Sequence, residues 1–386
     1  MKKLPICYVM PHFYPHIGGG EQAFLDTIYN LKNLYPNVEA RVITSSSGGI
    51  VGKHEHMGIE IISYPWKILF GHPIVNKKDL EEHITWADIV HVGVYSPVIP
   101  TVNLSRKLNK PIIVTAHESL NEKWFWVEPS KIKALLFRIY EKLTVTVKCD
   151  LFHVPSDATK RDLIQNNKNA KVKRIYWISD NKIDKTKPDK SSFYEAFKIN
   201  DKYTTFLYYG RPGQTKGIFV YEEAINILKN KLSDKELKNI KFCFIISKDP
   251  VKGLNKFKDY MKVNELDNLI EIRTDIKRND MLHFIKCTDY VVVPSITEGF
   301  GLSAIEACER GAKLIHSDGG SLPEVTYGKC VSFKNRNSED LANKLESIIK
   351  GKDIFKEKEK KDFSTETITK EFYEMYNEVL KDYGQK

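Results

Sequence analysis

The sequence predicts an α/β fold made of two domains with parallel sheets. Short runs of β-branched and aromatic residues alternate along the chain with segments of helical period. Strands joined by helical crossovers form parallel sheets that helices cover on both faces. A polar, charged stretch interrupts this pattern near the middle, and 386 residues are enough for two domains.

The first domain is predicted over residues 1–178. A strand at 6–10 leads into a helix at 21–34, in which Phe24, Ile28 and Leu31 share one face. The other elements expected in this domain are strands at 38–44, 59–63, 89–92, 112–116, 151–155 and 172–178, and a helix at 131–147.

The second domain is predicted over residues 204–363, after a charged linker at 179–203. The elements expected are strands at 204–209, 242–246, 269–273, 290–293 and 313–316, and helices at 217–231, 255–263 and 279–286. An amphipathic helix follows at about 364–386, with Phe372 and Tyr376 on its apolar stripe. We expect two Rossmann-like domains that face each other across a cleft.

Composition places the chain among folded proteins of a reducing compartment. Charged residues make up 28% and hydrophobic residues 41%, and no apolar run approaches the roughly 20 residues of a membrane span. Pro11 interrupts the apolar run near the start, so we expect a buried strand there and not a signal peptide. The six cysteines are scattered, without a CxxC pair. We therefore expect a cytoplasmic location.

The densest functional pattern lies between Pro294 and Val325. Glu298 follows a predicted strand, and Gly301 opens a helix that carries Glu306. A second strand then ends in a Gly-Gly pair at 319–320. Open α/β sheets bind ligands at the carboxyl ends of their strands, where helix starts offer N–H groups to anions and carboxylates accept hydrogen bonds from hydroxyls. A nucleotide sugar presents both phosphate and hydroxyl groups.

This pattern resembles the Glu-x7-Glu signature of retaining glycosyltransferases of the GT-B fold, family 4 in particular. Three further stretches resemble family motifs in the expected order: GGGE at 18–21, TAHE at 115–118 and GRPGQTKG at 210–217. Each lies at a predicted strand-to-helix junction. The resemblance runs from Ile6 to about Tyr376, and it implies a GT-B fold and sugar transfer from a nucleotide diphosphate sugar.

The loop at 210–217 supplies two candidate catalytic cations, Arg211 and Lys216. An Arg fork and a mobile Lys charge suit the negative charge that grows on a diphosphate leaving group. The resemblance places Glu298 beside the donor sugar and Glu306 on the ribose hydroxyls. It also implies that the backbone N–H groups of three residues contact sugar or phosphate: Phe300, Gly301 and Leu302.

In the first half, the resemblance implies that Gly18 and Gly19 reach the phosphate and the acceptor. It places His117 near the donor sugar, where we expect it to bond a hydroxyl and assign it to the catalytic residues. His91 is a weaker candidate that fits a buried strand better. The glycine loop does not match the dinucleotide fingerprint G-x-G-x-x-G, which argues against NAD.

Neither an Asp-x-Asp motif nor a His/Cys cluster is present, so we expect no metal and no cofactor. Net charge is +10, yet no nucleic-acid motif or compact basic block accompanies it, so a nucleic-acid partner is not expected. The segment at 121–140 carries Trp124, Phe125 and Trp126 beside several cations. It fits an anionic membrane surface and a core aromatic cluster equally well.

We therefore expect a metal-independent retaining glycosyltransferase that uses a UDP-, GDP- or ADP-sugar. Its acceptor would be a hydroxyl of a glycan or a lipid-linked glycan, and a lipid-linked acceptor would be reached from the cytoplasmic membrane face. Two alternatives stay open: a nucleotide-sugar epimerase of the same fold, and a non-catalytic nucleotide-sugar binding protein. The presence of Arg211, Lys216 and Glu298 argues against the second.

Overall fold

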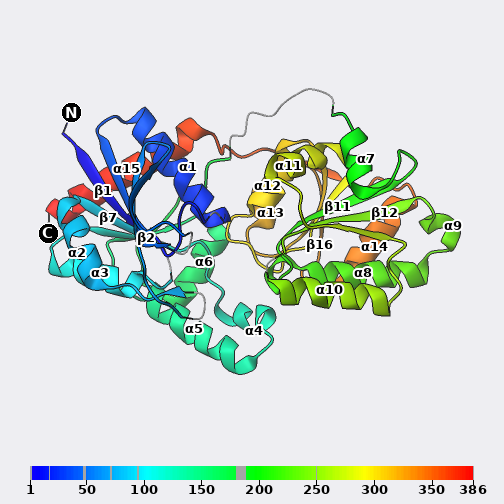
Figure 1. The fold of residues 1–386 in the computed structure, drawn as a ribbon, viewed down its shortest axis with the longest axis horizontal. Helices are drawn as coiled ribbons and strands as arrows, with labels where there is room; N and C mark the ends of the chain where they lie inside the picture. The colour runs from blue at the N-terminus through cyan, green and yellow to red at the C-terminus, as the bar shows by residue number, and fades with distance from the viewer. Residues whose placement is uncertain are drawn as a thin grey trace. The chain divides into compact units, whose positions relative to one another are not determined.

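The structure, a computed structural model, describes residues 2–16, 18–46, 49–69, 72–93, 95–179, 188–248 and 250–385. The chain divides into two compact units (Figure 1). Unit 1 contains Met1–Trp124, Ser130–Asp180 and Asp362–Lys386, and unit 2 contains Phe125–Pro129 and Asn181–Lys361. Of the linker expected at 179–203, residues 180–187 lie outside the described residues, and helix α7 occupies Ser191–Phe197.

Unit 1 is built on a sheet with the strand order β10-β9-β8-β7-β1-β2-β4-β3. Its strands are β1 Leu4–Val9, β2 Val38–Ser45, β3 Gly52–His56, β4 Ile59–Tyr64, β7 Ile89–Gly93, β8 Ile112–Thr115, β9 Leu151–Val154 and β10 Val172–Arg174. Neighbouring strands are parallel, except that edge strand β3 runs antiparallel to β4. A two-stranded hairpin, β5 Ile68–Leu69 and β6 His72–Pro73, stands outside this sheet.

The helices of unit 1 are α1 Gly19–Leu34, α2 Lys77–Trp86, α3 Val98–Lys107, α5 Lys131–Val145, α6 Asp157–Asn166 and α15 Thr365–Gly384. Three of them, α1, α5 and α15, begin and end close to the positions expected from the sequence, and no bounds were predicted for the other three. A short helix, α4 Trp124–Val127, is divided between the two units, with Trp124 in unit 1 and the residues after it in unit 2. Strand β10 is shorter than expected and ends at Arg174, although the N–H of Ile175 still donates to the carbonyl of Val154 at 3.1 Å. Trp177 stacks on Phe372 of α15, with ring centres 5.6 Å apart.

Unit 2 is built on a sheet with the order β13-β12-β11-β14-β15-β16-β17. Its strands are β11 Thr204–Gly210, β12 Ile240–Ile246, β13 Ile270–Arg273, β14 Tyr290–Val293, β15 Lys313–Ser317, β16 Gly328–Phe333 and β17 Lys356–Lys358. Its helices besides α7 are α8 Ile218–Lys231, α9 Asp234–Leu237, α10 Val251–Val263, α11 Arg278–Cys287, α12 Leu302–Glu309, α13 Leu322–Val325 and α14 Ser338–Ile349. Only β17, at the edge, pairs antiparallel among the described strands of this sheet. The expected α/β class with two parallel sheets is confirmed.

The last helix, α15, belongs to unit 1 although unit 2 precedes it in the sequence. It packs alongside α1 (Figure 1), where Tyr373 stacks on Tyr35 with ring centres 3.8 Å apart. Its buried stripe includes Phe372 and Tyr376, as the amphipathic pattern predicts. The two ends of the sequence therefore complete one hydrophobic core.

A buried chain of hydrogen bonds joins α15 to four strands of unit 1. The bonded pairs are Tyr8–Tyr376 at 3.0 Å, Tyr376–His91 at 2.8 Å, His91–Thr115 at 2.6 Å, Thr115–His153 at 2.8 Å and His153–Ile175 at 2.9 Å. Because Nε2 of His153 meets a carbonyl oxygen, it must donate, and Nδ1 of the neutral ring then accepts from Thr115. Burial lowers the pKa of His153 to about 3 and that of His91 well below its usual value, so both rings are neutral.

Candidate active site

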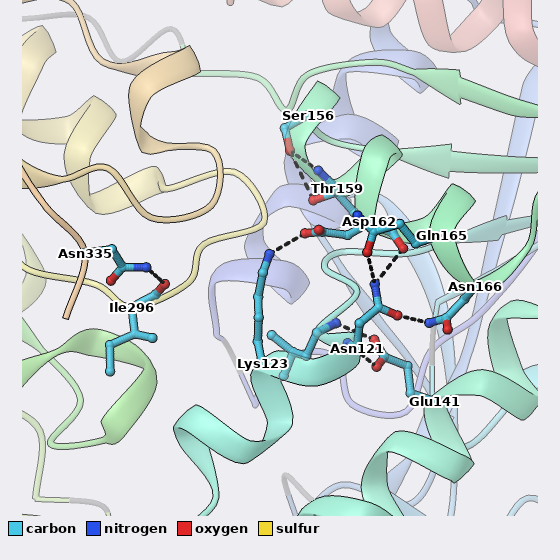
Figure 2. A network of polar contacts seen from close by, with 11 residues as sticks. Asn121, Lys123, Glu141, Ser156, Thr159, Asp162, Gln165, Asn166, Ile296 and Asn335 are labelled. Atoms are coloured by element: carbon cyan, nitrogen blue, oxygen red, sulfur yellow. Dashed lines mark hydrogen bonds and ion pairs between the residues drawn. The ribbon is translucent and has the colours of Figure 1, made fainter.

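The backbone of the loop after β14 is held by three hydrogen bonds within unit 2. The N–H of Ile296 donates to the carbonyl of Thr215 at 2.8 Å, and the N–H of Ser321 donates to the carbonyl of Glu298 at 3.0 Å. Asn335 Nδ2 donates to the carbonyl of Ile296 at 2.8 Å (Figure 2). These contacts fix the backbone that carries Glu298.

Glycines make this close packing possible. A Cβ atom on Gly217 would lie 1.7 Å from the carbonyl oxygen of Pro294, and one on Gly320 would lie 2.4 Å from that of Glu298. Both glycines also have positive φ, +67° and +57°, which favours glycine over other residues. The glycine pattern therefore serves backbone-to-backbone contact around the Glu298 loop.

Lys216 and Glu298 form an ion pair at this edge of the sheet. Lys216 Nζ lies 2.7 Å from Glu298 Oε1, and Ser295 Oγ donates to the same oxygen at 2.7 Å. Lys216 ends the turn that follows β11, and Glu298 follows β14, which is the neighbour of β11 in the sheet. Adjacent parallel strands thus bring together two residues that are 82 positions apart in the sequence.

Arg211 lies at the start of the same turn, with an exposed side chain. Its carbonyl accepts from the N–H of Gly213 at 2.9 Å and from Tyr208 Oη at 3.2 Å. The backbone at Arg211 is therefore held while the guanidinium faces solvent. A cation presented this way can meet an anionic ligand.

Helix α12 begins directly after Gly301, which has a φ of +85°. Phe300 is buried and Leu302 is half-buried at the first position of the helix. Glu306, in the second turn, is 7% exposed in its side chain and pairs with Arg278 of α11 at 2.5 Å. The helix start predicted from the glycines is present, and its first-turn N–H groups lie next to the Glu298 loop.

The candidate residues of unit 1 gather at the start of α1. The N–H of Gly18 donates to Glu21 Oε2 at 2.9 Å, so Glu21 caps the helix whose first residue is Gly19. The imidazole of His117 lies over Gly20, where an added Cβ would be 3.2 Å from the ring. The GGGE and TAHE motifs are therefore neighbours in space.

His117 is half-buried and packs between two aromatic rings. The ring centres of Phe24 and Trp177 lie 5.5 and 5.6 Å from its own. Desolvation lowers the pKa of His117 to about 4, opposed by the charge of Glu21. The ring is therefore neutral at physiological pH and can both donate and accept a hydrogen bond. His91 is fully buried in the polar chain of unit 1, which confirms its structural interpretation.

Three residues of this site were not predicted from the sequence: Ser295, Arg278 and Asn335. Ser295 precedes Glu298 by three residues and holds its carboxylate. Arg278 and Asn335 come from distant helices and loops, so no local signal pointed to them. Among the described residues, no group of three or more His, Cys, Asp or Glu side chains is placed to hold a metal ion.

The aromatic segment at 124–126 is only partly exposed. Trp124 packs on Phe137, with ring centres 5.1 Å apart, and donates its indole N–H to Glu141 at 2.9 Å. Phe125 and Trp126 are each 40% exposed. Trp124 therefore fits the core interpretation. Within the part of the chain that the structure describes, no helix is long and apolar enough to cross a membrane.

Comparison with solved structures identifies the fold. A sucrose-phosphate synthase from Thermosynechococcus elongatus superposes over 98% of this chain and 100% of its own, with a TM-score of 0.76 at 16% identity. A glycosyltransferase from Rickettsia africae covers 99% and 100%, with a TM-score of 0.71 at 19% identity. Anabaena HepE, solved with UDP and glucose, covers 96% and 99%, with a TM-score of 0.71 at 15% identity. This is the GT-B fold.

Family models cover both units. Residues 17–178 match the model described as Glycosyltransferase Family 4, and residues 189–368 match Glycosyl transferases group 1. The chain belongs to this family, group 1 glycosyltransferases of family 4. Both the family resemblance and the fold expected from the sequence are thereby confirmed.

Curated relatives match over shorter stretches. The gpi3 subunit of phosphatidylinositol N-acetylglucosaminyltransferase from Schizosaccharomyces pombe is 28% identical over 160 residues, 41% of this chain and 33% of its own. A D-inositol 3-phosphate glycosyltransferase from Corynebacterium kroppenstedtii is 27% identical over 149 residues, 38% of this chain and 32% of its own. The chain thus covers about a third of the length of these relatives.

Proposed function

We propose that this protein is a retaining glycosyltransferase. It transfers a sugar from a UDP-, GDP- or ADP-sugar to a hydroxyl of a glycan or lipid-linked glycan. The observation that carries the proposal is the Lys216–Glu298 pair beside the start of α12, at the carboxyl ends of neighbouring parallel strands. Ligands of open α/β sheets bind at such edges.

In this proposal Lys216 and Arg211 neutralise the diphosphate. Lys216 already lies 2.7 Å from a carboxylate, so its charge is compensated before the donor binds. A diphosphate brings more negative charge than one carboxylate and gains still more as the glycosidic bond breaks. Cations fixed where that charge develops stabilise the transition state more than the bound substrate.

The two carboxylates take different parts of the donor. Glu298, held by Ser295 in the loop, contacts the sugar hydroxyls. Glu306, inside α12 and paired with Arg278, accepts from the ribose hydroxyls, because a carboxylate has acceptor sites for more than one donor. The N–H groups of the loop and helix start, from Phe300 to Leu302, contact phosphate or sugar.

Transfer occurs on one face of the sugar. The bond from the anomeric carbon to the phosphate oxygen breaks, and a bond to the acceptor oxygen forms on the same side. The acceptor proton moves to the departing phosphate, so no protein nucleophile is required. Gly18, Gly19 and His117 contact phosphate, acceptor and sugar, and neutral His117 bonds a sugar hydroxyl.

The names of similar proteins support this choice of substrates. One solved relative carries UDP and glucose, and two curated relatives are named for transfer to inositol-containing acceptors. Epimerase chemistry has no comparable support among these names.

The proposal is tested first by binding. A thermal-shift screen of UDP, GDP and ADP should reveal one nucleotide that raises the melting temperature of the wild type. Glu306→Gln should weaken binding of that nucleotide, whereas Glu298→Gln should leave nucleotide affinity nearly intact and reduce transfer. The reverse pattern in titration calorimetry would contradict both assignments. Release of nucleotide without any acceptor, accompanied by a changed sugar configuration, would instead indicate an epimerase.

We also propose that transfer needs no metal ion. The diphosphate is neutralised by Arg211, Lys216 and the start of α12. Activity should therefore persist in the presence of a chelator. Complete loss that manganese or magnesium restores would contradict this proposal.

A further inference from the structure

Helix α5 of unit 1 carries an apolar stripe that faces solvent. Five residues of the stripe are between 46% and 75% exposed: Ile132, Leu135, Leu136, Ile139 and Leu143. At the roughly 100° turn per residue of an α-helix, their spacing places them within about 100° of arc. Figure 1 shows α5 as a helix at the margin of unit 1.

The opposite face of α5 holds the helix to its unit. Ala134 and Val145 are buried there, and Glu141 accepts from the N–H groups of Leu120 and Asn121 at 2.6 and 2.9 Å (Figure 2). Burial raises the pKa of Glu141. Because these contacts attach this face of α5 to unit 1, the apolar stripe on the other face is directed to solvent in the packed structure.

Cations border the stripe on both sides. By the same helical geometry Lys131, Arg138 and Lys142 lie along one flank and Lys133 lies along the other. The one carboxylate within α5, Glu141, points inward. Arg138 pairs with Glu122 of a neighbouring turn at 2.5 Å. The three lysines add positive charge along the helix, and no carboxylate of the described residues forms an ion pair with them.

A second apolar segment lies beside this helix. The ring of His72, in hairpin β5–β6, is 6.1 Å from that of Tyr140 of α5. Ile68 and Leu69 in the same hairpin are about half exposed, at 48% and 54%. Other exposed apolar residues of unit 1 lie in separate segments, such as Val51 and Met57, whereas α5 gathers five of them on one face.

We propose that α5 docks unit 1 on an anionic membrane surface. An apolar stripe flanked by cations matches a lipid interface, where acyl chains take the apolar face and acidic headgroups take the lysines. A second copy of this chain would present the same positive flanks and repel. Resting on the proposed function, this docking directs the enzyme to a lipid-linked acceptor.

Co-sedimentation with vesicles tests the docking without any sugar donor. The wild type should bind vesicles of phosphatidylglycerol mixed with phosphatidylcholine, and should bind pure phosphatidylcholine weakly. Binding should fade as salt rises, since charges are screened over about 8 Å at physiological ionic strength. Leu136→Ser/Ile139→Ser and Lys131→Glu/Lys142→Glu should each lower the partition coefficient about tenfold or more.

Helix α10 of unit 2 supplies matched controls. It also carries several lysines, but its strongly exposed apolar residues are confined to its ends, Val251 and Val263. Val263→Ser and Lys258→Glu/Lys262→Glu should leave vesicle binding within about twofold of the wild type. Circular dichroism and melting temperature verify that each variant is folded.

Three results would overturn the docking proposal. These are no binding to acidic vesicles at low salt, equal losses in the α5 and α10 variants, and a wild-type dimer in sedimentation velocity that the α5 variants dissociate. The last result would assign the stripe to a second copy. Nucleotide binding in the thermal-shift screen is independent of vesicles, so failure of the proposed function would be seen separately.

Discussion

At the scale of single residues, Lys216 neutralises Glu298 in the structure and is a cation proposed to bind the diphosphate of the donor. Its partner Glu298 is only 10% exposed in its side chain, and Ser295 Oγ donates to the same carboxylate oxygen as the lysine. Removal of the lysine leaves a poorly solvated carboxylate where the diphosphate should bind. The loss should therefore combine missing attraction with added repulsion.

Lys216→Ala should reduce turnover by a factor that corresponds to roughly 2–4 kcal/mol, as for other groups that stabilise developing charge. Arg211→Ala should have an effect in the same direction. Because Arg211 is exposed, the melting temperature of the Arg211→Ala variant should stay near that of the wild type. Lys248→Ala, which removes an exposed lysine paired with Asp275, is the control for general charge loss. Unchanged turnover in both site variants would exclude the diphosphate role.

Buried histidines predict how unit 1 responds to acid. The pKa values of His117 and His153 are lowered to about 4 and about 3, from an unfolded value near 6.5. The unfolded chain therefore binds more protons than the folded unit between these values. Stability is fully present above about pH 6.5 and falls below it, by up to about 1.4 kcal/mol per pH unit for each histidine.

Urea unfolding at pH 7.5 and pH 5 checks this prediction by tryptophan fluorescence. All five tryptophans lie between residues 66 and 177, so the signal reports mainly unit 1. His283→Gln, at a half-buried position in unit 2, should leave the pH dependence of this signal unchanged. Equal stability of the wild type at the two pH values would contradict the prediction.

At the scale of elements, two glycines with the same backbone conformation differ in how closely other residues approach them. Gly217 and Gly311 have nearly equal φ values, +67° and +70°. An added Cβ on Gly217 would meet the Pro294 carbonyl at 1.7 Å, whereas one on Gly311 would meet nothing within 4 Å. The pair separates backbone strain from steric contact.

Gly311→Ala should cost only the strain of a left-handed backbone, about 1–2 kcal/mol. Gly217→Ala should cost considerably more and should also abolish transfer, because the loop that carries Glu298 must move. The measurement is the free energy of unfolding of unit 2, followed by circular dichroism, together with turnover. Equal effects of the two substitutions would show that the Pro294 contact is unimportant.

The same scale shows what the sequence can predict. Strands such as Tyr290–Val293 were predicted from their apolar runs, and α12 from its glycines. The edge strands β3 and β17 were not anticipated, because GKHEH and KEK are polar and pair on one side only. Trp124 could not be oriented from sequence, since its partner Glu141 lies 17 residues away.

At the scale of the whole molecule, α15 connects the end of the sequence to unit 1 through Tyr376. Its hydroxyl lies between Tyr8 and His91 in the buried polar chain. Tyr376→Phe would leave His91 Nδ1 without its donor and should cost about 1–3 kcal/mol of stability.

Tyr373→Phe on the same helix is the matched control. Its hydroxyl lies 3.3 Å from the Asn37 amide at a partly exposed site, so its loss should cost less than about 1 kcal/mol. Urea unfolding monitored by tryptophan fluorescence compares the two variants. If Tyr373→Phe destabilised unit 1 as much as Tyr376→Phe, the buried hydrogen bonds would contribute no more to stability than a partly exposed one.

The placement of α15 also orders events during translation. Residues 1–180 leave the ribosome before Asn181–Lys361, the main part of unit 2, yet the core of unit 1 lacks Phe372 and Tyr376 until α15 emerges. Most of unit 2 is one continuous stretch, Asn181–Lys361, and is available earlier as a whole. During synthesis, unit 2 should therefore complete its folding before unit 1. Until α15 is made, Trp177 of unit 1 lacks its contact with Phe372 and stays accessible to chaperones.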